Sequence, residues 1–320
     1  MKRLVLAIET SCDETATAVV SVDMEILSNV VLSQIPIHSK YGGVVPEIAS
    51  RNHIKVIDQV VQKALDDAKV LMSDISAVAA TTHPGLPGAV LIGRIFGEAL
   101  ALRNNVPFIS INHIHGHIAS VPLSMGESEL EKHIALVISG GHTSLYKVAK
   151  SGKVVLLEQT LDDAIGEAFD KVARVLGLSY PGGPEIEKQA NKWIGNDELI
   201  KFVAKPNYQI QGFSYSGLKT AVLNYVNKIK MKGEEINLPH LAASFQYEAI
   251  SQLVFKVNRI LKSTKVKTLC VSGGVSANEY LRKTLTEECS KLGVKVSFPH
   301  KSLCGDNAAM IAAASILELK

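Results

Sequence analysis

Three histidines lie close together in the segment 112–119, directly after an apolar run. On a helix, His113 and His117 would lie one turn apart on one face and His115 would point away from them. On a strand all three would project to the same side. We favour the helix, because Asn112 is a good N-cap and the residues after His117 show no alternation of period two. Imidazoles at i and i+4 form half of a typical transition-metal site, which a carboxylate usually completes. Spacing alone leaves a histidine-rich turn without metal as the alternative.

Asp306 is the candidate for that carboxylate. It stands just before the last expected helix of the chain, which begins within residues 306–310. An aspartate in this position is also a good N-cap, so capping the helix is the competing role.

A polar turn, residues 9–15, separates two apolar runs that predict strands at 4–8 and 16–20. It carries Asp13 and Glu14 together with hydroxyl side chains that can contact phosphate or metal-bound water. We interpret it as a hairpin whose tip holds chemistry, and an ordinary solvated hairpin is the alternative.

Glycine pairs follow two buried apolar runs, in the segments 139–144 and 272–278. Adjacent glycines free backbone N–H groups to approach an anion closely. The segment 83–88 also begins a helix with small residues, but as an anion signal it is weak, and we interpret it as packing.

Lysines recur from Lys188 to Lys232, Lys205 included, and indicate either a solvated helix face or contacts to a phosphate backbone.

The bulk composition describes a globular protein of two lobes. The chain has 320 residues, 47% hydrophobic and 20% charged, and a formal net charge of +3, which permits a nucleic-acid partner without arguing for one. It has four cysteines, with no CxxC pair. We find no secretory signal and no run long enough to cross a bilayer, so we expect a soluble, cytoplasmic protein.

The order of the expected elements indicates an α/β fold. A strand, a polar turn and a second strand occur at 4–20 and again at 134–148, which suggests two related lobes clasping a ligand. Further strands are expected at 26–32, 77–82, 106–111, 266–271 and 294–298. One helix is expected to begin at Pro46 and another after residue 85. A third should end near Gly177, and a fourth should cover 240–261.

Eight segments together resemble TsaD, the tRNA N6-adenosine threonylcarbamoyltransferase family, and they cover nearly the whole chain in the family's order. They are residues 8–15, 112–117, 139–143, 166–171, 180–184, 213–219, 272–278 and 306–312. The resemblance implies a two-lobed actin/sugar-kinase/Hsp70-like ATPase fold with a central nucleotide cleft. We expect residues 1–130 plus 300–320 to form the N-terminal lobe and 131–299 the C-terminal, nucleotide-side lobe.

The same resemblance implies an activity. Such enzymes pass a threonylcarbamoyl group from threonylcarbamoyl-AMP to N6 of the adenosine 3′ to the anticodon of tRNA, releasing AMP. The family's metal ligands fall on His113, His117 and Asp306, in agreement with the spacing argument, with iron(II) favoured and zinc possible. Its adenylate contacts fall on Ser139, Gly140, Gly141, His142, Thr143, Asp170, Gly183, Glu187 and Asn278. The implied partners are tRNA, a TsaB-like paralogue and a TsaE-like ATPase. The resemblance implies no association with a membrane.

Two acids at the hairpin tip motivate a hypothesis about the chemistry. An aromatic exocyclic amine is a poor nucleophile, so we expect Asp13 to deprotonate or orient it, with Glu14 beside it. Asp170 and Glu187 suit ribose hydroxyls. The sequence departs from the family pattern at His115, where many relatives carry Glu and where metal choice could change. It also departs at His83 and His240, which lie outside the ligand set.

Three other functions compete with this interpretation. A kinase or ATPase of the same fold could use Asp13 for phosphoryl transfer, but would leave the two histidines unexplained. A zinc protease would need the HExxH glutamate, which is absent after His113. A non-catalytic nucleotide-binding scaffold would not need histidines and an aspartate from distant parts of the chain.

Overall fold

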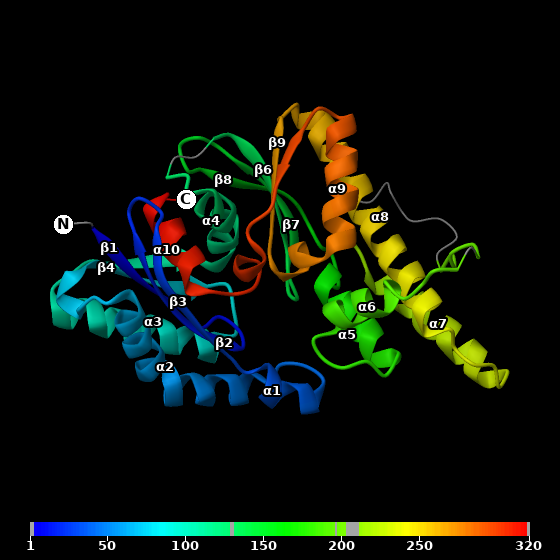
Figure 1. Ribbon diagram of the computed structural model, residues 1–320, viewed down its shortest axis with the longest axis horizontal. Coiled ribbons are helices and arrows are strands. Elements are labelled where there is room, and N and C mark those ends of the chain that lie inside the picture. The colour runs from blue at the N-terminus through cyan, green and yellow to red at the C-terminus, as the bar shows by residue number, and fades with distance from the viewer. Residues whose placement is uncertain (1–2, 129–130, 196, 203–210, 319–320) are drawn as a thin grey trace. The chain divides into compact units, whose positions relative to one another are not determined.

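The computed structural model describes residues 3–128, 131–195, 197–202 and 211–318 (Figure 1). The chain divides into two compact units. Unit 1 consists of Met1–Lys132, Val148–Val154 and Pro299–Lys320, and unit 2 of His133–Lys147 and Val155–Phe298. Residues 148–154, which the sequence analysis assigned to the C-terminal lobe, therefore belong to unit 1.

Unit 1 is built on a five-stranded sheet in the order β3-β2-β1-β4-β5. The strands are β1 (Leu4–Glu9), β2 (Glu14–Ser21), β3 (Ile26–Ser33), β4 (Ile75–His83) and β5 (Phe108–Asn112). The first three pair antiparallel, whereas β4 runs parallel to β1 and β5 parallel to β4. The carboxyl ends of β1, β4 and β5 therefore meet at one edge, from which the hairpin tip and the histidine helix continue.

Side chains of β1 alternate between two cores, as the period of a strand requires. Leu4, Leu6 and Ile8 pack toward α2 (Pro46–Ala68) and α3 (Pro87–Asn104). Val5 and Ala7 pack on the opposite face, toward α4 (His113–Met125) and α10 (Ala308–Ile316). By the same alternation Glu9, the last residue of β1, belongs to the face that α4 and α10 cover. Short helical segments, α1 (Ile35–His38), η1 (Ser39–Tyr41), η2 (Met72–Asp74) and η4 (Lys301–Leu303), complete the unit.

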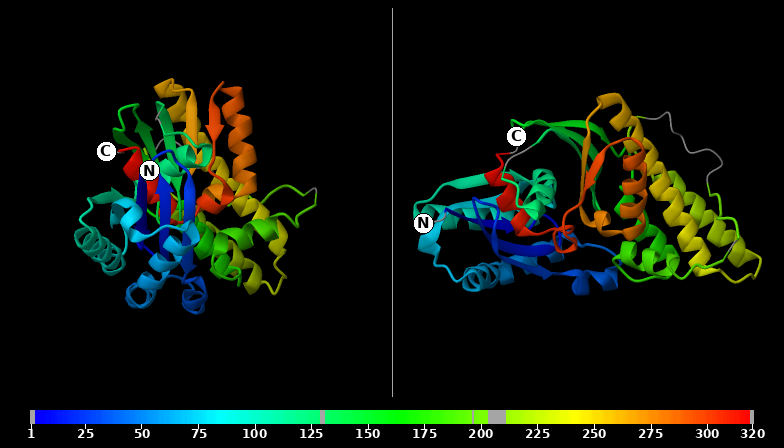
Figure 2. Two further views of the ribbon diagram at one scale, coloured as in Figure 1. Left: turned by 60° about the vertical axis from the view of Figure 1, so that its left-hand side comes forward. Right: turned by 45° about the horizontal axis from the view of Figure 1, so that its top comes forward.

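Unit 2 repeats this strand order. Read from the β8 edge, its sheet runs β8-β7-β6-β9-β10, so that, as in unit 1, the third, second, first, fourth and fifth strands follow one another across it. The strands are β6 (His133–Ile138), β7 (Thr143–Val148), β8 (Val154–Gln159), β9 (Thr268–Ser272) and β10 (Lys295–Ser297). The helices are α5 (Ile165–Val175), α6 (Gly182–Ala190), α7 (Ser216–Met231), α8 (Leu238–Thr264) and α9 (Glu279–Lys291), with the short η3 (Gly274–Ala277). Figure 2 shows α8 lying beside α9 in both views.

Most of the expected elements are confirmed, with ends shifted by a few residues. The helix expected from Pro46 begins there, with proline in its first turn, and the histidine segment is helical. The sequence analysis missed β8, α1 and α7. Within the segment 180–184 that resembles the family, α6 begins at Gly182. In the described part of the chain, no helix is both long and apolar enough to span a membrane.

Candidate metal centre and catalytic residues

His113, His117 and Asp306 converge in unit 1. His113 Nε2 lies 3.6 Å from Asp306 Oδ1, and His117 Nε2 lies 3.2 Å from the same oxygen. One ligand atom from each of the three residues lies within 4.8 Å of the others. Three donors that are each about 2.0–2.2 Å from one ion stand roughly 3–3.5 Å apart, so the cluster needs little adjustment to hold a cation.

Local structure explains the convergence. The Asn112 side chain accepts a hydrogen bond from Ile114 N at 2.7 Å, which starts α4 at His113 and fixes the two histidines one turn apart. Between them, a Cβ on Gly116 would stand 2.6 Å from Ile311 Cδ1, so glycine here lets α4 approach α10 closely. Asp306 immediately precedes α10 and is thereby brought to the histidines.

The competing role of Asp306 as the helix cap is wrong. Asn307 is the N-cap of α10, and its Oδ1 accepts from Met310 N at 3.0 Å. Because the neighbouring residue satisfies the end of the helix, the Asp306 carboxylate is available to the histidines.

The donor set fits a divalent transition metal. His117 is fully buried, and neither of its ring nitrogens has a hydrogen-bond partner among the residues that the structure describes. Its Nε2 lies 3.2 Å from Asp306 Oδ1 without forming a hydrogen bond, and a buried imidazole that makes no hydrogen bond is costly unless something else binds it. Two imidazoles and one carboxylate are ligands that iron(II) and zinc accept, and three protein ligands leave coordination positions open.

The charge around His113 also favours a cation. Burial alone would lower the pKa of His113, but the nearby carboxylates of Glu9 and Asp306 outweigh it and raise this pKa to about 9. Burial would raise the pKa of Glu9, yet the charge and hydrogen bond of His113 lower it. Without metal, His113 therefore holds a second proton, whose positive charge balances Glu9 and Asp306. A bound cation would supply that positive charge instead.

The hairpin tip is buried and not solvated. Asp13 is 8% exposed, and burial raises the pKa of its carboxyl. Burial, together with the charge of Asp13, raises the pKa of Glu14 to about 8, and Glu14 Oε1 accepts from Ser33 Oγ at 2.7 Å. Glu14 is thus mostly protonated at neutral pH, which leaves Asp13 as the stronger candidate for a base in this pair.

His53, which the sequence analysis did not select, anchors this hairpin. From the buried face of α2, its Nε2 donates to Cys12 O at 3.0 Å and its Nδ1 accepts from Thr15 Oγ1 at 2.7 Å. It therefore holds the Cys12 backbone and the Thr15 side chain, one on each side of the Asp13–Glu14 pair. The available signal was its position, because Ala49, His53 and Ile57 recur at a spacing of four on the buried face of α2.

The remaining predicted site residues lie in unit 2, on the loops around β6, β7 and β9 and on α5 and α6. Within the loop after β6, Ser139 N donates to His142 O at 2.8 Å, which makes a tight turn. A Cβ added to Gly140, Gly141 or Gly183 would meet no described atom within 4 Å, so the space beside these glycines is open. A Cβ on Gly166 would stand 2.4 Å from Ser139 O, so the start of α5 packs directly beneath this loop.

Four polar side chains predicted to contact the adenylate hold the backbone in place. Thr143 Oγ1 accepts from Ile165 N at 2.8 Å, Asp170 Oδ1 from Gly182 N at 2.6 Å, and Glu187 Oε1 from Glu279 N at 2.6 Å. Asn278 caps α9 by accepting from Leu281 N at 2.9 Å. These residues position the glycine loops and the helix ends that begin beside them.

The three histidines at departures from the family pattern lie outside the metal cluster. His115 is not among the converging ligands. His240 stacks on Trp193, with ring centroids 4.3 Å apart, and its Nε2 contacts Glu198 O. His83 Nδ1 lies 3.0 Å from Thr82 Oγ1.

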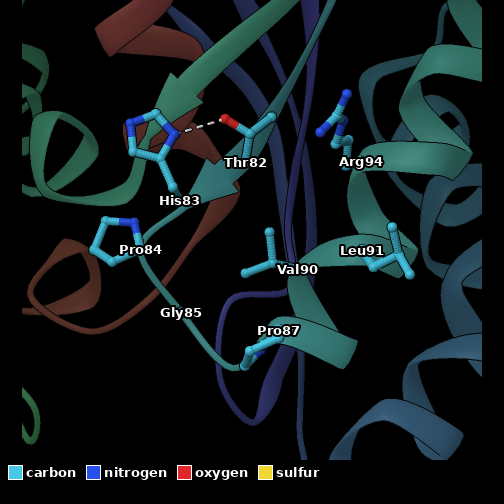
Figure 3. A pocket seen from close by; sticks show the side chains of 8 residues that line it. All are labelled: Thr82, His83, Pro84, Gly85, Pro87, Val90, Leu91 and Arg94. Atoms are coloured by element: carbon cyan, nitrogen blue, oxygen red, sulfur yellow. Dashed lines mark hydrogen bonds between the residues drawn. The ribbon is translucent and has the colours of Figure 1, made fainter.

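The pocket of about 310 Å³ at the start of α3 contains none of the predicted site residues. Figure 3 shows Thr82, His83 and Arg94 around it together with Pro84, Pro87, Val90 and Leu91. Arg94 is already paired with Glu98 at 2.8 Å, so the pocket offers little to an anion, which agrees with our interpretation of this segment as packing.

Several lysines of the range 188–232 are likewise paired inside unit 2. Lys219 contacts Asp163, Lys201 contacts Glu198, and Lys188 contacts Glu185. Lys205 lies outside the described residues. Lys188 and Lys219 lie on α6 and α7, whereas Lys201 lies on no described helix, so contacts to a phosphate backbone stay a prediction.

Comparison with solved structures supports the two-lobed α/β fold. The chain is similar to HypF of T. kodakarensis (TM-score 0.65, 15% identity, covering 99% of this chain and 48% of that one). It is also similar to component A of the Acidaminococcus fermentans (R)-2-hydroxyglutaryl-CoA dehydratase (TM-score 0.60, 14% identity, covering 99% of both chains). These likenesses show that the chain has the actin/sugar-kinase/Hsp70-like fold.

Sequence comparison shows the family. A tRNA N6-adenosine threonylcarbamoyltransferase of Clostridium botulinum is 49% identical over 316 residues, which are 98% of this chain and 92% of that protein. The family model for TsaD, tRNA N6-adenosine threonylcarbamoyltransferase, matches residues 25–313. The chain that brings His113, His117 and Asp306 together therefore belongs to the TsaD family.

Proposed function

We propose that this chain transfers the threonylcarbamoyl group of threonylcarbamoyl-AMP to N6 of the adenosine 3′ to the anticodon, in tRNAs that read codons beginning with adenine, and releases AMP. The observation that carries the proposal is the cluster of two buried histidines, His113 and His117, with Asp306 in a member of this transferase family. A phosphoryl-transferring relative of the same fold would leave that cluster without a use.

His113 Nε2, His117 Nε2 and one Asp306 oxygen would hold one divalent metal, for which we favour iron(II) over zinc. When bound, a metal with open positions polarises a carbonyl and orients the oxygens of the substrate. The histidines contribute rigidity, because both are buried and lie one helical turn apart on a capped helix. Positioning of this kind can supply about 7–11 kcal/mol of a reaction barrier.

Asp13 would accept or orient the proton of the incoming amine. Its buried carboxyl has a raised pKa, so it is a stronger base than an exposed aspartate. His53 would keep it in place through the neighbouring backbone, and Glu14, protonated at neutral pH, would donate a hydrogen bond instead of competing for the same proton.

The residues of unit 2 would bind the adenylate. The open space beside Gly140, Gly141 and Gly183 supports approach of a phosphate or nucleoside to backbone N–H groups. Ser139, His142 and Thr143 would shape this loop. Asp170, Glu187 and Asn278, which already hold backbone amides, would present their remaining acceptors to ribose hydroxyls.

The family implies further requirements. We propose tRNA as the acceptor, a TsaB-like paralogue and a TsaE-like ATPase as partner proteins, and the cytoplasm as the compartment where these meet.

The test is reconstitution from purified components. The chain, loaded with iron(II) or zinc and combined with its partner proteins, is incubated with threonylcarbamoyl-AMP and unmodified tRNA, and digested nucleosides are analysed by mass spectrometry. Threonylcarbamoyladenosine should form and AMP should be released in equal amount. No modified nucleoside in this reaction, together with phosphate transfer from ATP by the chain alone in a parallel reaction, would favour the kinase alternative.

A further inference from the structure

Glu9 is a fully buried carboxylate that contacts a predicted metal ligand. It ends β1, and its side chain is 0% exposed. Its Oε1 accepts from Ser11 N at 2.5 Å, and its Oε2 accepts from Thr81 Oγ1 at 2.5 Å. His113 Nδ1 lies 3.0 Å from the same Oε2.

The direction of these bonds fixes the tautomer of His113. A backbone N–H can only donate, so Glu9 Oε1 acts as an acceptor, and Oε2 accepts from the Thr81 hydroxyl in the same way. A carboxylate oxygen placed between these groups accepts from Nδ1–H, so the contact favours the ring with its hydrogen on Nδ1. Ser11 Oγ, 3.1 Å from Nδ1, can accept from the same N–H.

The other ring nitrogen then faces the cluster. His113 Nε2 is the atom that lies 3.6 Å from Asp306 Oδ1, and the His117 ring packs edge-on against His113 at a centroid distance of 4.7 Å. A histidine whose Nδ1 carries the hydrogen has its lone pair on Nε2 when neutral. The contact with Glu9 therefore turns Nε2 toward Asp306 and His117, where the neutral ring has its lone pair once a metal displaces the second proton.

We infer that Glu9 is a positioning residue that holds His113 in the Nδ1–H tautomer and so presents Nε2 to the divalent metal. The inference rests on the proposed function, because it takes His113 to be a metal ligand. Outer carboxylates of this kind orient ligating histidines in many metal sites, and their loss weakens metal binding by about 10–100-fold.

An amide cannot replace this carboxylate. In Glu9→Gln, an NH₂ group in the place of Oε2 would face the donor His113 Nδ1–H, while the Thr81 hydroxyl could turn and accept from it. Turning the amide round would place the NH₂ group against the Ser11 N–H. Either orientation of the amide leaves one buried N–H group facing another. The clash with His113 Nδ1–H ends only if His113 carries its hydrogen on Nε2 instead, where the hydrogen blocks metal binding.

The test compares metal binding in the full-length wild type and Glu9→Gln after chelation. Co²⁺ alone is titrated into each protein, with its visible absorption as the readout, and circular dichroism checks the fold. We expect about 10–100-fold weaker binding in the variant and recovery of transfer activity at high Co²⁺. Asp23→Asn, which removes an exposed acid from the turn after β2, is the matched control and should bind Co²⁺ like the wild type.

The outcomes separate the two proposals. Equal Co²⁺ affinity in wild type and Glu9→Gln would overturn the role of Glu9 while the metal site stands. A wild type that binds no Co²⁺ would overturn the metal site itself, and this inference with it. Should Glu9→Gln not fold, ¹⁵N-histidine NMR of the Zn²⁺-loaded wild type decides: hydrogen on Nδ1 of His113 supports the inference, and hydrogen on Nε2 contradicts it.

Discussion

The metal cluster of unit 1 and the predicted adenylate residues of unit 2 differ in how completely their polar atoms are satisfied. His117 is buried and its ring nitrogens have no hydrogen-bond partner within the described chain, whereas Asp170, Glu187 and Asn278 all accept bonds from backbone amides. Buried polar groups in folded proteins are nearly always paired. The metal cluster of unit 1 therefore has polar atoms left to bind a ligand. In unit 2 the same kind of atoms already hold the backbone of the loops. We expect substitutions of the metal ligands in unit 1 to remove function with little loss of stability, and substitutions of the backbone-holding residues in unit 2 to affect both.

The largest effect is expected for Asp306→Asn. The amide keeps the shape of the side chain but loses the charge that the two histidines face at 3.2 Å and 3.6 Å. Bound metal, measured by mass spectrometry of the intact protein, and transfer should both fall to background. The unfolding midpoint of the metal-free protein should barely change, since Asn307 caps the helix. Metal retained at the wild-type level would remove Asp306 from the ligand set.

Asp13→Asn should reduce turnover while metal content and AMP binding stay normal. Loss of a general base typically costs about 10²–10⁴-fold, and the amide preserves the shape of the buried tip. Single-turnover transfer, monitored as modified nucleoside, measures this, and Asp23→Asn serves again as a control with an exposed acid. Normal turnover would exclude Asp13 from the mechanism.

Asp170→Ala tests the other side of the comparison. It deprives Gly182 N of its acceptor at the start of α6, which should lower the free energy of unfolding by about 1–3 kcal/mol. Weaker binding of the adenylate, with unchanged metal content, should accompany it. Denaturant unfolding and calorimetric titration with AMP give the two numbers. Unchanged stability with lost binding would mean that Asp170 serves the ligand alone.

The smallest effect is expected for Asn307→Ala. Removing this N-cap should cost about 0.5–2 kcal/mol of stability, and the metal should remain bound. Together with Asp306→Asn it separates the capping role from the ligand role in adjacent residues. A variant that loses its metal would show that the cap also fixes the carboxylate.

Local signals in the sequence predicted the elements that position the metal site. The sequence did not predict contacts between residues far apart in the chain. Asn112 and Pro46 mark helix starts through their own backbone chemistry, so the helices of His113 and of residues 46–68 followed from neighbouring residues. Spacing also gave the histidine pair. The roles of Asp306 and Asn307 were not separable, because both are good caps and only packing of α10 decides between them.

Glu9 and His53 illustrate what was missed. Glu9 ends an apolar strand, and its contact with His113 spans 104 positions, so it depends on which helices cover that face of the sheet. Strand alternation places it with Val5 and Ala7, but the sequence does not say that α4 and α10 lie there. His53 could have been found, since it interrupts the apolar stripe of α2 at a buried position.

Metal analysis of the wild type and His113→Ala, purified alike without oxygen, tests the central claim most directly. We predict about one iron or zinc ion per chain in the wild type, and in His113→Ala neither metal nor transfer of threonylcarbamoyl to tRNA. A wild-type chain that is free of transition metal and still modifies tRNA at full rate would contradict the proposed site.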